Sequence, residues 1–181
     1  MKKLIAVLMA LCLLCTAVAA FADAATGAKE ERYNGAKFGM TMDEVIAVEG
    51  AAGKKDTEHT HGPVTFEELE YEDVTDAYLG NVTIDRSYLF ADGKLAAIRL
   101  DIDTKDISYE AVKEALAAFG ELSELDLALL GNGIYAVDDD GTPEKNTLAI
   151  QNGDEMVVLE LDNDGDDIDV TFVDLTAAYI K

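Results

Sequence analysis

The chain has 181 residues, of which 37 are acidic and 14 are basic, and its formal net charge is −23 at pH 7. Nucleic acids and anionic membranes bind cationic surfaces, so this charge excludes nucleic acid as an expected partner and favours a cation or a basic protein. Strong negative charge also keeps any exported protein dispersed, so solubility alone would account for it.

Residues 1–22 have the pattern of an export signal peptide. Two lysines precede an apolar stretch over residues 4–14, and Ala20-Phe21-Ala22 fits a small-x-small cleavage site. The apolar stretch is shorter than the roughly 20 residues that cross a bilayer. We therefore expect a mature chain without a membrane span, secreted or located in the periplasm or at the cell-envelope exterior. Loss of the two lysines would change the net charge from −23 to −25.

Both cysteines, Cys12 and Cys15, belong to this signal, so the mature chain is expected to depend on a packed core rather than on disulfides. Each cysteine follows a leucine where a lipid-modified cysteine prefers a small residue, which argues against a lipoprotein. Residues 23–32 lack large apolar side chains, and we expect them to form a mobile leader.

A helix start follows at Thr41. This threonine can cap a helix, and Glu44, three residues on, can bond back to the Thr41 backbone N–H. Gly50 predicts the helix end, because glycine readily takes the left-handed conformation of a helix stop. Residues 50–64 have no periodicity and predict a loop, and residues 64–72 predict a bulged edge strand with its break at Glu67-Glu68.

Residues 81–103 predict a β-hairpin around a three-residue turn, Ala91-Asp92-Gly93. The alternation of apolar and polar residues favours one register, because a slip of one residue would turn every side chain to the other face. The expected pairs are Val82–Ile102, Ile84–Leu100 and Arg86–Ile98 on the apolar face, and Thr83–Asp101, Asp85–Arg99 and Leu89–Leu95 on the other.

The second half of the chain begins like the first, with a cap at Ser108. The helix that follows should carry Val112, Leu116 and Phe119 on one stripe and end at Gly120. Later signals are an Asn152-Gly153 hairpin that joins residues 147–151 to 154–161, and an alternating strand over residues 168–174.

These elements repeat in two halves, residues 33–103 and residues 104–181, each with a capped helix followed by strands. The order predicts an α+β fold with one or two tandem units, each a short helix packed on an antiparallel β-sheet. The two halves could be separate units or one continuous domain.

Four features resemble small secreted bacterial proteins of the BamE (SmpA/OmlA) and β-lactamase-inhibitor-protein-like type. They are Gly35, the run Phe38-Gly39-Met40-Thr41 with Glu44-Val45, the turn Asp92-Gly93-Lys94-Leu95, and the second capped helix ending at Gly120. The similarity covers about residues 33–120 and, more loosely, the second half. It implies helix-plus-sheet units that bind other proteins rather than catalyse a reaction. The chain lacks the lipid-attachment motif of the lipid-anchored members, so their assembly role does not carry over.

Two patterns suggest metal ligands. His59 and His61 would share one side of a strand-like backbone, where Zn²⁺ or Cu²⁺ could bind, but a third firm ligand is missing and solvated side chains in a polar loop explain them better. Asp162, Asp164 and Asp166 alternate around Gly165, as in oxygen-rich Ca²⁺ loops, but the glutamate of an EF-hand is missing and an acidic turn explains the same pattern.

Catalytic signals are few. The mature chain has no cysteine, three serines and no Gly-x-Ser-x-Gly motif. Paired carboxylates could serve a hydrolase, but the absence of tryptophan removes the usual platform for stacking sugars. We therefore expect a non-catalytic module without a cofactor.

The function expected from these patterns is an exported acidic module that binds a basic protein. The docking surface would be the sheet face left open by the helices, with Leu89, Leu95 and Arg99 on it. The alternatives are an extracellular Ca²⁺-binding protein, suggested by residues 162–167 and 138–140, and a carboxylate-based hydrolase.

Overall fold

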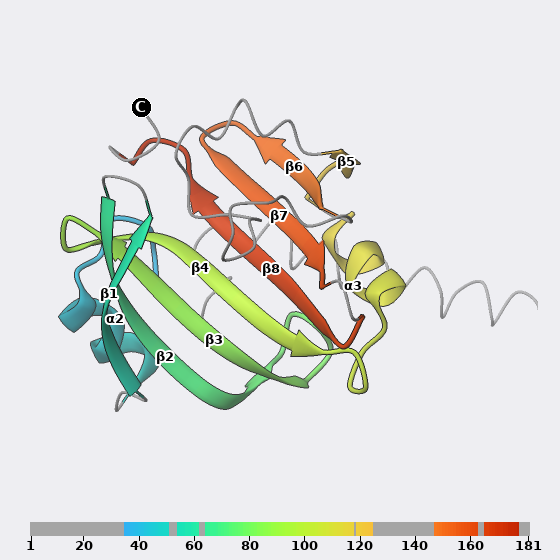
Figure 1. Ribbon diagram of the computed structural model, residues 1–181, viewed down its shortest axis with the longest axis horizontal. Helices are drawn as coiled ribbons and strands as arrows, with labels where there is room; N and C mark the ends of the chain where they lie inside the picture. Colours follow the sequence, from blue (N-terminus) through green and yellow to red (C-terminus); the bar gives the residue numbers. More distant parts are fainter. Residues whose placement is uncertain are drawn as a thin grey trace, which may run out of the picture.

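The computed structural model describes residues 35–50, 54–61, 64–117, 119–124, 147–162 and 165–177, with two helices and eight strands among them (Figure 1). Their bounds are α2 (Met42–Glu49), β1 (Lys54–His61), β2 (Val64–Asp76), β3 (Val82–Ala91), β4 (Lys94–Asp103), α3 (Tyr109–Leu116), β5 (Ser123–Glu124), β6 (Leu148–Asn152), β7 (Glu155–Leu161) and β8 (Asp167–Asp174).

All eight strands belong to one antiparallel sheet with the order β1-β2-β3-β4-β8-β7-β6-β5. The expected α+β fold of one or two tandem helix-plus-sheet units is therefore wrong. Pairing of β4 with β8 joins strands from both halves of the chain into a continuous sheet, and the two short helices are a small part of the structure. Local patterns cannot reveal this pairing, because it connects strands that are far apart in sequence.

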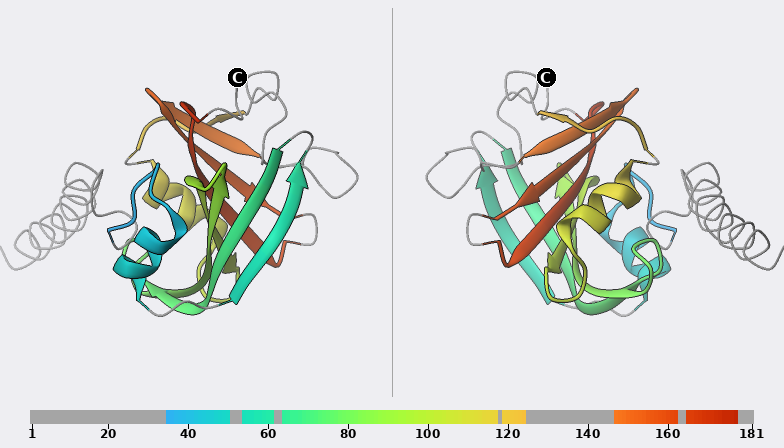
Figure 2. Two further views of the ribbon diagram at one scale, coloured as in Figure 1. Left: turned by 90° about the vertical axis from the view of Figure 1, so that its left-hand side faces the viewer. Right: turned by 90° about the vertical axis from the view of Figure 1, so that its right-hand side faces the viewer.

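Both helices lie on one side of the strongly curved and twisted sheet, which we call the inner face (Figure 2). Val45 of α2 and Val112 and Leu116 of α3 are fully buried and belong to a single hydrophobic core with inward residues of the sheet. The largest inward side chains of the central strands are Tyr88, Phe90, Leu95, Ile98, Ile102, Ile168 and Phe172. The opposite surface of the sheet is called the outer face.

Helix α2 forms as the sequence predicts. The Glu44 N–H donates to Thr41 Oγ1 at 3.4 Å and the Thr41 N–H donates to Glu44 Oε2 at 2.8 Å, which completes the capping box. These bonds from Thr41 hold the pKa of Glu44 below its usual value. Gly50 ends the helix at φ 99°, a conformation that favours glycine.

Helix α3 also begins at its predicted cap, where Ser108 Oγ accepts the Ala111 N–H at 3.3 Å. Val112, Leu116 and Phe119 are buried, as the stripe predicts. The regular helix ends at Leu116, before the predicted stop at Gly120.

The central hairpin forms, but its predicted register is wrong. Asp92 (φ 52°) and Gly93 (φ 72°) make a two-residue turn, so Ala91 pairs with Lys94 instead of lying in the turn. A bulge near Ala96 then shifts the rest of β4. The resulting pairs are Asp85–Asp101, Arg86–Leu100, Ser87–Arg99, Tyr88–Ile98, Leu89–Ala97 and Phe90–Leu95. A shift of two residues leaves the faces of β3 unchanged, because side chains alternate with a period of two.

The predicted loop over residues 50–64 is also wrong in part, because Lys54–His61 is strand β1 at the edge of the sheet. An edge strand can be polar on both faces, so no alternation marks it in the sequence. Strand β2 lies between β1 and β3 and extends to Asp76, and its bulge against β3 falls between Tyr71 and Val74. Asp73 lies in this bulge at φ 54°.

The hairpin of the second half follows the prediction closely. Asn152 pairs with Glu155, so the turn consists of Gly153 and Asp154, one residue later than expected. Its inward side chains are those predicted, since Leu148 pairs with Leu159 and Ile150 with Val157.

Candidate functional site

The outer face of the sheet divides into an apolar part and an acidic part. The apolar part is a cluster of buried residues, against which Leu175 and Ala177 pack. We call it the outer apolar cluster, and it consists of Leu89, Ala91, Ala96, Ala97, Ala149, Met156, Val158 and Val173.

Further along the same face, acidic side chains from four adjacent strands lie directly opposite one another. Asp85 of β3 pairs with Asp101 of β4, Asp101 with Asp169 of β8, and Asp169 with Glu160 of β7. We call these four residues the carboxylate row. Side chains that face each other across neighbouring strands have Cβ atoms roughly 4.5–5.5 Å apart. The Asp73 N–H donates to Asp85 Oδ1 at 2.7 Å, which ties the bulge of β2 to one end of the row.

The charges in the row act on one another. Loss of solvation, followed by the neighbouring carboxylates of Asp169, Asp167 and Asp85, raises the pKa of Asp101 to about 6 against the opposing effect of Arg99. Within the described residues, the carboxylate of Asp101 accepts no hydrogen bond. Asp167, which pairs with Asp103 beside the row, also has a raised pKa, through loss of solvation and then the charge of Asp162.

Arg99 partly neutralises the row. Its Nε and Nη2 atoms donate to the two carboxylate oxygens of Asp169 at 2.8 and 2.7 Å. The Arg99 side chain is 50% exposed and that of Asp169 is 23% exposed, so this ion pair is open to solvent. The hydrogen bonds from Arg99 to Asp169 raise the pKa of Arg99, which keeps it charged. The Arg99 guanidinium thus acts on three carboxylates of the row, those of Asp169, Asp101 and Glu160.

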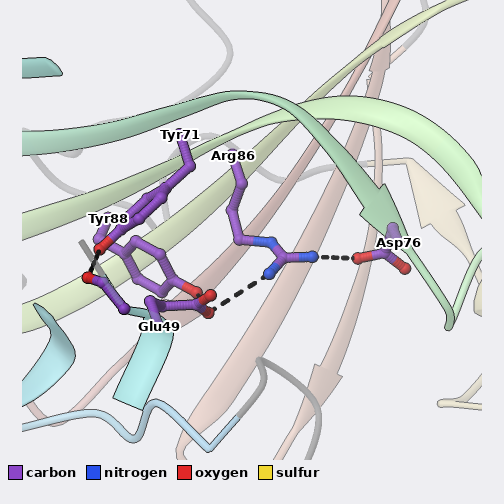
Figure 3. Close-up of polar contacts among 6 residues, drawn as sticks. Glu49, Tyr71, Asp76, Arg86 and Tyr88 are labelled. Carbon is purple, nitrogen blue, oxygen red and sulfur yellow. Dashed lines mark hydrogen bonds and ion pairs between the residues drawn. The ribbon is translucent and has the colours of Figure 1, made fainter. Parts of the chain in front are cut away.

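A second polar cluster is buried on the inner face (Figure 3). Arg86 of β3 lies between two carboxylates, with Nη2 at 2.6 Å from Asp76 Oδ2 and Nη1 at 3.3 Å from Glu49 Oε1. The Tyr88 hydroxyl donates to Glu49 Oε1, and the Tyr71 hydroxyl donates to the Gly50 carbonyl at 3.5 Å. The two tyrosine rings meet edge to face, with centroids 5.9 Å apart.

The surroundings of this buried cluster favour a protonated Tyr88 and a charged Arg86. Burial raises the pKa of Tyr88 far above its ordinary value, so its hydroxyl stays protonated and donates to Glu49. Burial opposes the charge of Arg86, but Tyr88, Asp76 and Glu49 outweigh that effect and raise its pKa. The arrangement is suited to holding α2 on the sheet, because each charged group forms an ion pair with a group of opposite charge.

The structure separates the two leucines that the predicted register pairs. Leu95 pairs with Phe90 and is 1% exposed in the inner core, whereas Leu89 pairs with Ala97 and is 8% exposed in the outer apolar cluster. They lie on opposite faces, so the predicted leucine pair does not form. Arg99 does lie on the outer face, paired with Ser87 and bonded to Asp169.

The predicted Ca²⁺ loop is organised by one of its own carboxylates. Asp162 Oδ1 accepts the backbone N–H groups of Gly165, Asp166 and Asp167 at 2.6, 2.9 and 3.4 Å, as expected for an acidic turn. The Asp166 carbonyl accepts the Thr104 N–H at 2.7 Å. Asp164 lies outside the described residues, as do residues 138–140.

The histidines lie in β1, where His59 pairs with Phe66 and His61 with Val64. The extended backbone places the two residues on the same side of the strand, as the spacing predicts, but their side chains lie outside the described part of the structure. Within the described residues, no group of three or more His, Cys, Asp or Glu side chains is placed to hold a metal ion.

Comparison of the chain with protein-family models, curated proteins and solved structures finds no match. The resemblance to BamE and β-lactamase-inhibitor proteins therefore stays a prediction. In the part of the chain that the structure describes, neither helix has the length and apolar character needed to cross a membrane.

The carboxylate row is the feature that sequence patterns miss. Acidic residues alternate with apolar ones in residues 100–103 and 167–170, which marks them as outward residues of two strands. Only the pairing of β4 with β8 shows that these two sets lie side by side.

Proposed function

We propose that this protein is an exported, non-catalytic binding module whose outer sheet face binds a basic protein. The carboxylate row carries the proposal. Like charges placed directly opposite one another destabilise a sheet, and a sequence that breaks such a local rule commonly does so at a functional site. The lysines and arginines of a partner would relieve the repulsion.

The geometry of the row favours an extended partner segment. Asp85, Asp101, Asp169 and Glu160 cross four neighbouring strands nearly at right angles to the strand direction. Glu160 is only 8% exposed, so the first three residues form the accessible part of the row. Strands in a sheet are about 4.8 Å apart, so the two steps between these residues span about 10 Å. Alternate side chains on one face of an extended peptide are roughly 6.6 Å apart, so two cations of such a segment fit along this part of the row.

The binding test uses a fluorescent peptide with alternating lysine and threonine as a probe of defined charge. Its affinity for the wild type is compared with that for the double variant Asp85→Asn/Asp101→Asn. The control variant is Asp43→Asn/Glu114→Gln, because both residues are exposed, belong to the helices on the inner face and carry the same total charge as the two row residues. We expect the row variant to bind at least about tenfold more weakly than the control, at about 50 mM NaCl.

Equal affinities for the two variants would contradict the proposal, because the peptide would then respond to net charge alone. Association should also slow steeply between about 50 and 300 mM NaCl, since attraction between exposed charges is screened by salt. An association rate independent of salt would count equally against an electrostatic docking surface.

A further inference from the structure

The two helices on the inner face are both linked to the connection between β2 and β3, residues 77–81. Helix α2 is linked to it indirectly, because Glu49, its last residue, whose side chain is 6% exposed, binds Arg86, which in turn binds Asp76. Helix α3 is contacted by Tyr78, which lies within this connection. The two helices belong to different halves of the chain, so this connection lies between elements that are far apart in sequence.

Arg86 forms the first part of the link. Its guanidinium binds Glu49 on one side and Asp76 on the other, and all three side chains are at most 8% exposed. Asp76 in turn holds the connection, because its Oδ1 accepts the Leu79 N–H at 3.0 Å and its carbonyl accepts the Asn81 N–H at 2.8 Å. The position of the connection thus depends on where Arg86 places Asp76.

Tyr78 forms the second part. Its hydroxyl donates to the Ala115 carbonyl of α3 at 3.2 Å, and its ring packs against Phe119 with centroids 5.4 Å apart. Phe119 packs in turn on Phe172 of the central strand β8, at 5.8 Å. The C-terminal turn of α3 therefore rests on the same connection that Asp76 holds.

We infer that Arg86 and the β2–β3 connection couple the two helices, so that displacement of α2 loosens α3. The physical basis is a continuous route of buried charge pairs, backbone hydrogen bonds and ring contacts from Glu49 to Ala115, each step of which fixes the next. A helix of eight residues has little stability alone, so each helix depends on its contacts with the sheet. A partner that moved either helix would therefore change the other.

A double-mutant cycle in the full chain tests the coupling by urea denaturation. Glu49→Ala removes the carboxylate that holds α2, and Tyr78→Phe removes only the hydroxyl that binds α3. Each single variant changes the unfolding equilibrium constant by some factor, and independent changes would give the double variant the product of the two factors. We expect the factor of the double variant to differ from that product by about twofold or more. The control cycle combines Glu49→Ala with Ser108→Ala, which weakens α3 at its cap, and here we expect the factor of the double variant to equal the product.

Native-state hydrogen exchange of Glu49→Ala locates the effect. Amides of α2, of Leu79 and of the last turn of α3 should exchange faster, while those of β6 and β7 should keep their wild-type rates. Three results would overturn the inference. The first is a Tyr78→Phe cycle in which the double variant shows the product of the single changes in the unfolding equilibrium constant. The other two are faster amide exchange in α2 alone, and an equal increase in exchange rate throughout the sheet.

Discussion

Gly93 makes the sharp turn of the central hairpin possible. Both turn residues have positive φ, 52° at Asp92 and 72° at Gly93, which L-residues with branched side chains adopt only with strain. We expect Gly93→Val to lower the free energy of unfolding by about 1–3 kcal/mol, measured by urea denaturation. The cause is the backbone rather than crowding, because a Cβ at Gly93 would meet no atom within 4 Å.

Asp92→Asn is the matched control for the same turn, because asparagine tolerates the left-handed conformation well. Its free energy of unfolding should stay within about 0.5 kcal/mol of the wild type. Equal losses in the two variants would argue against the two-residue turn.

Asp101 makes stability depend on pH. Its pKa is about 6 in the folded protein against an ordinary value of 3.8, so the folded state binds more protons than the unfolded state between these values. Its contribution is therefore favourable below pH 3.8 and is lost as the pH rises through about 6. We expect Asp101→Asn to raise the free energy of unfolding at neutral pH and to flatten its change between about pH 4 and 7.

Denaturant unfolding of the wild type and of Asp101→Asn at several pH values provides the measurement. Asp106→Asn is the control, because it removes an exposed carboxylate outside the row. Parallel pH profiles for Asp101→Asn and the wild type would show that the row does not repel the Asp101 charge.

At the scale of elements, the two helix caps should contribute independently to stability. Thr41 and Ser108 each accept a backbone N–H at a helix start, and the loss of such a cap costs about 1 kcal/mol. We expect Thr41→Ala and Ser108→Ala each to show this loss, and the double variant to show their sum, because the caps lie at the helix starts, away from the C-terminal ends that the β2–β3 connection links. A loss in only one variant would mean that the other cap is replaced by solvent.

Elements with a local cause could be predicted. Three such elements are the capping box at Thr41, the cap at Ser108 and the turn at Gly153. Each depends on residues within a few positions of one another, so it can be recognised from the sequence. Strand β1 could not be predicted, because its polar residues carry no alternation and its pairing with β2 supplies the stabilisation.

The candidate site was less predictable than the helices. Arg99 could be placed on the outer face, because its alternation with apolar residues does not depend on the partner strand. Its ion pair with Asp169 could not be predicted, since it requires the β4–β8 register. The position of Leu89 and Leu95 on opposite faces could not be predicted either, because no local residue such as glycine indicates the bulge near Ala96.

For the whole molecule, the melting temperature with and without Ca²⁺ tests the alternative that the protein binds Ca²⁺. A ligand of the folded state at ten times its Kd adds about 1.4 kcal/mol of stability. Because Asp162 already accepts three backbone N–H groups, we expect the melting temperature in about 10 mM CaCl₂ to equal that in NaCl of the same ionic strength. A rise specific to Ca²⁺ would favour a cation-binding protein, and Asp162→Asn would then show whether this turn is the site.

The antiparallel pairing of β4 with β8 also sets an order of events during synthesis. Asp103 at the end of β4 pairs with Asp167 at the start of β8, which is the last of the described strands in the sequence. The junction between β4 and β8 therefore stays unpaired until the ribosome has made the other described strands. Until then β4 has a neighbour on one side only, and Ile98, Leu100 and Ile102 have no β8 to pair with. Such late, long-range closure slows folding and leaves apolar surface open to aggregation. We expect the nascent chain to need protection by a holding chaperone until β8 emerges.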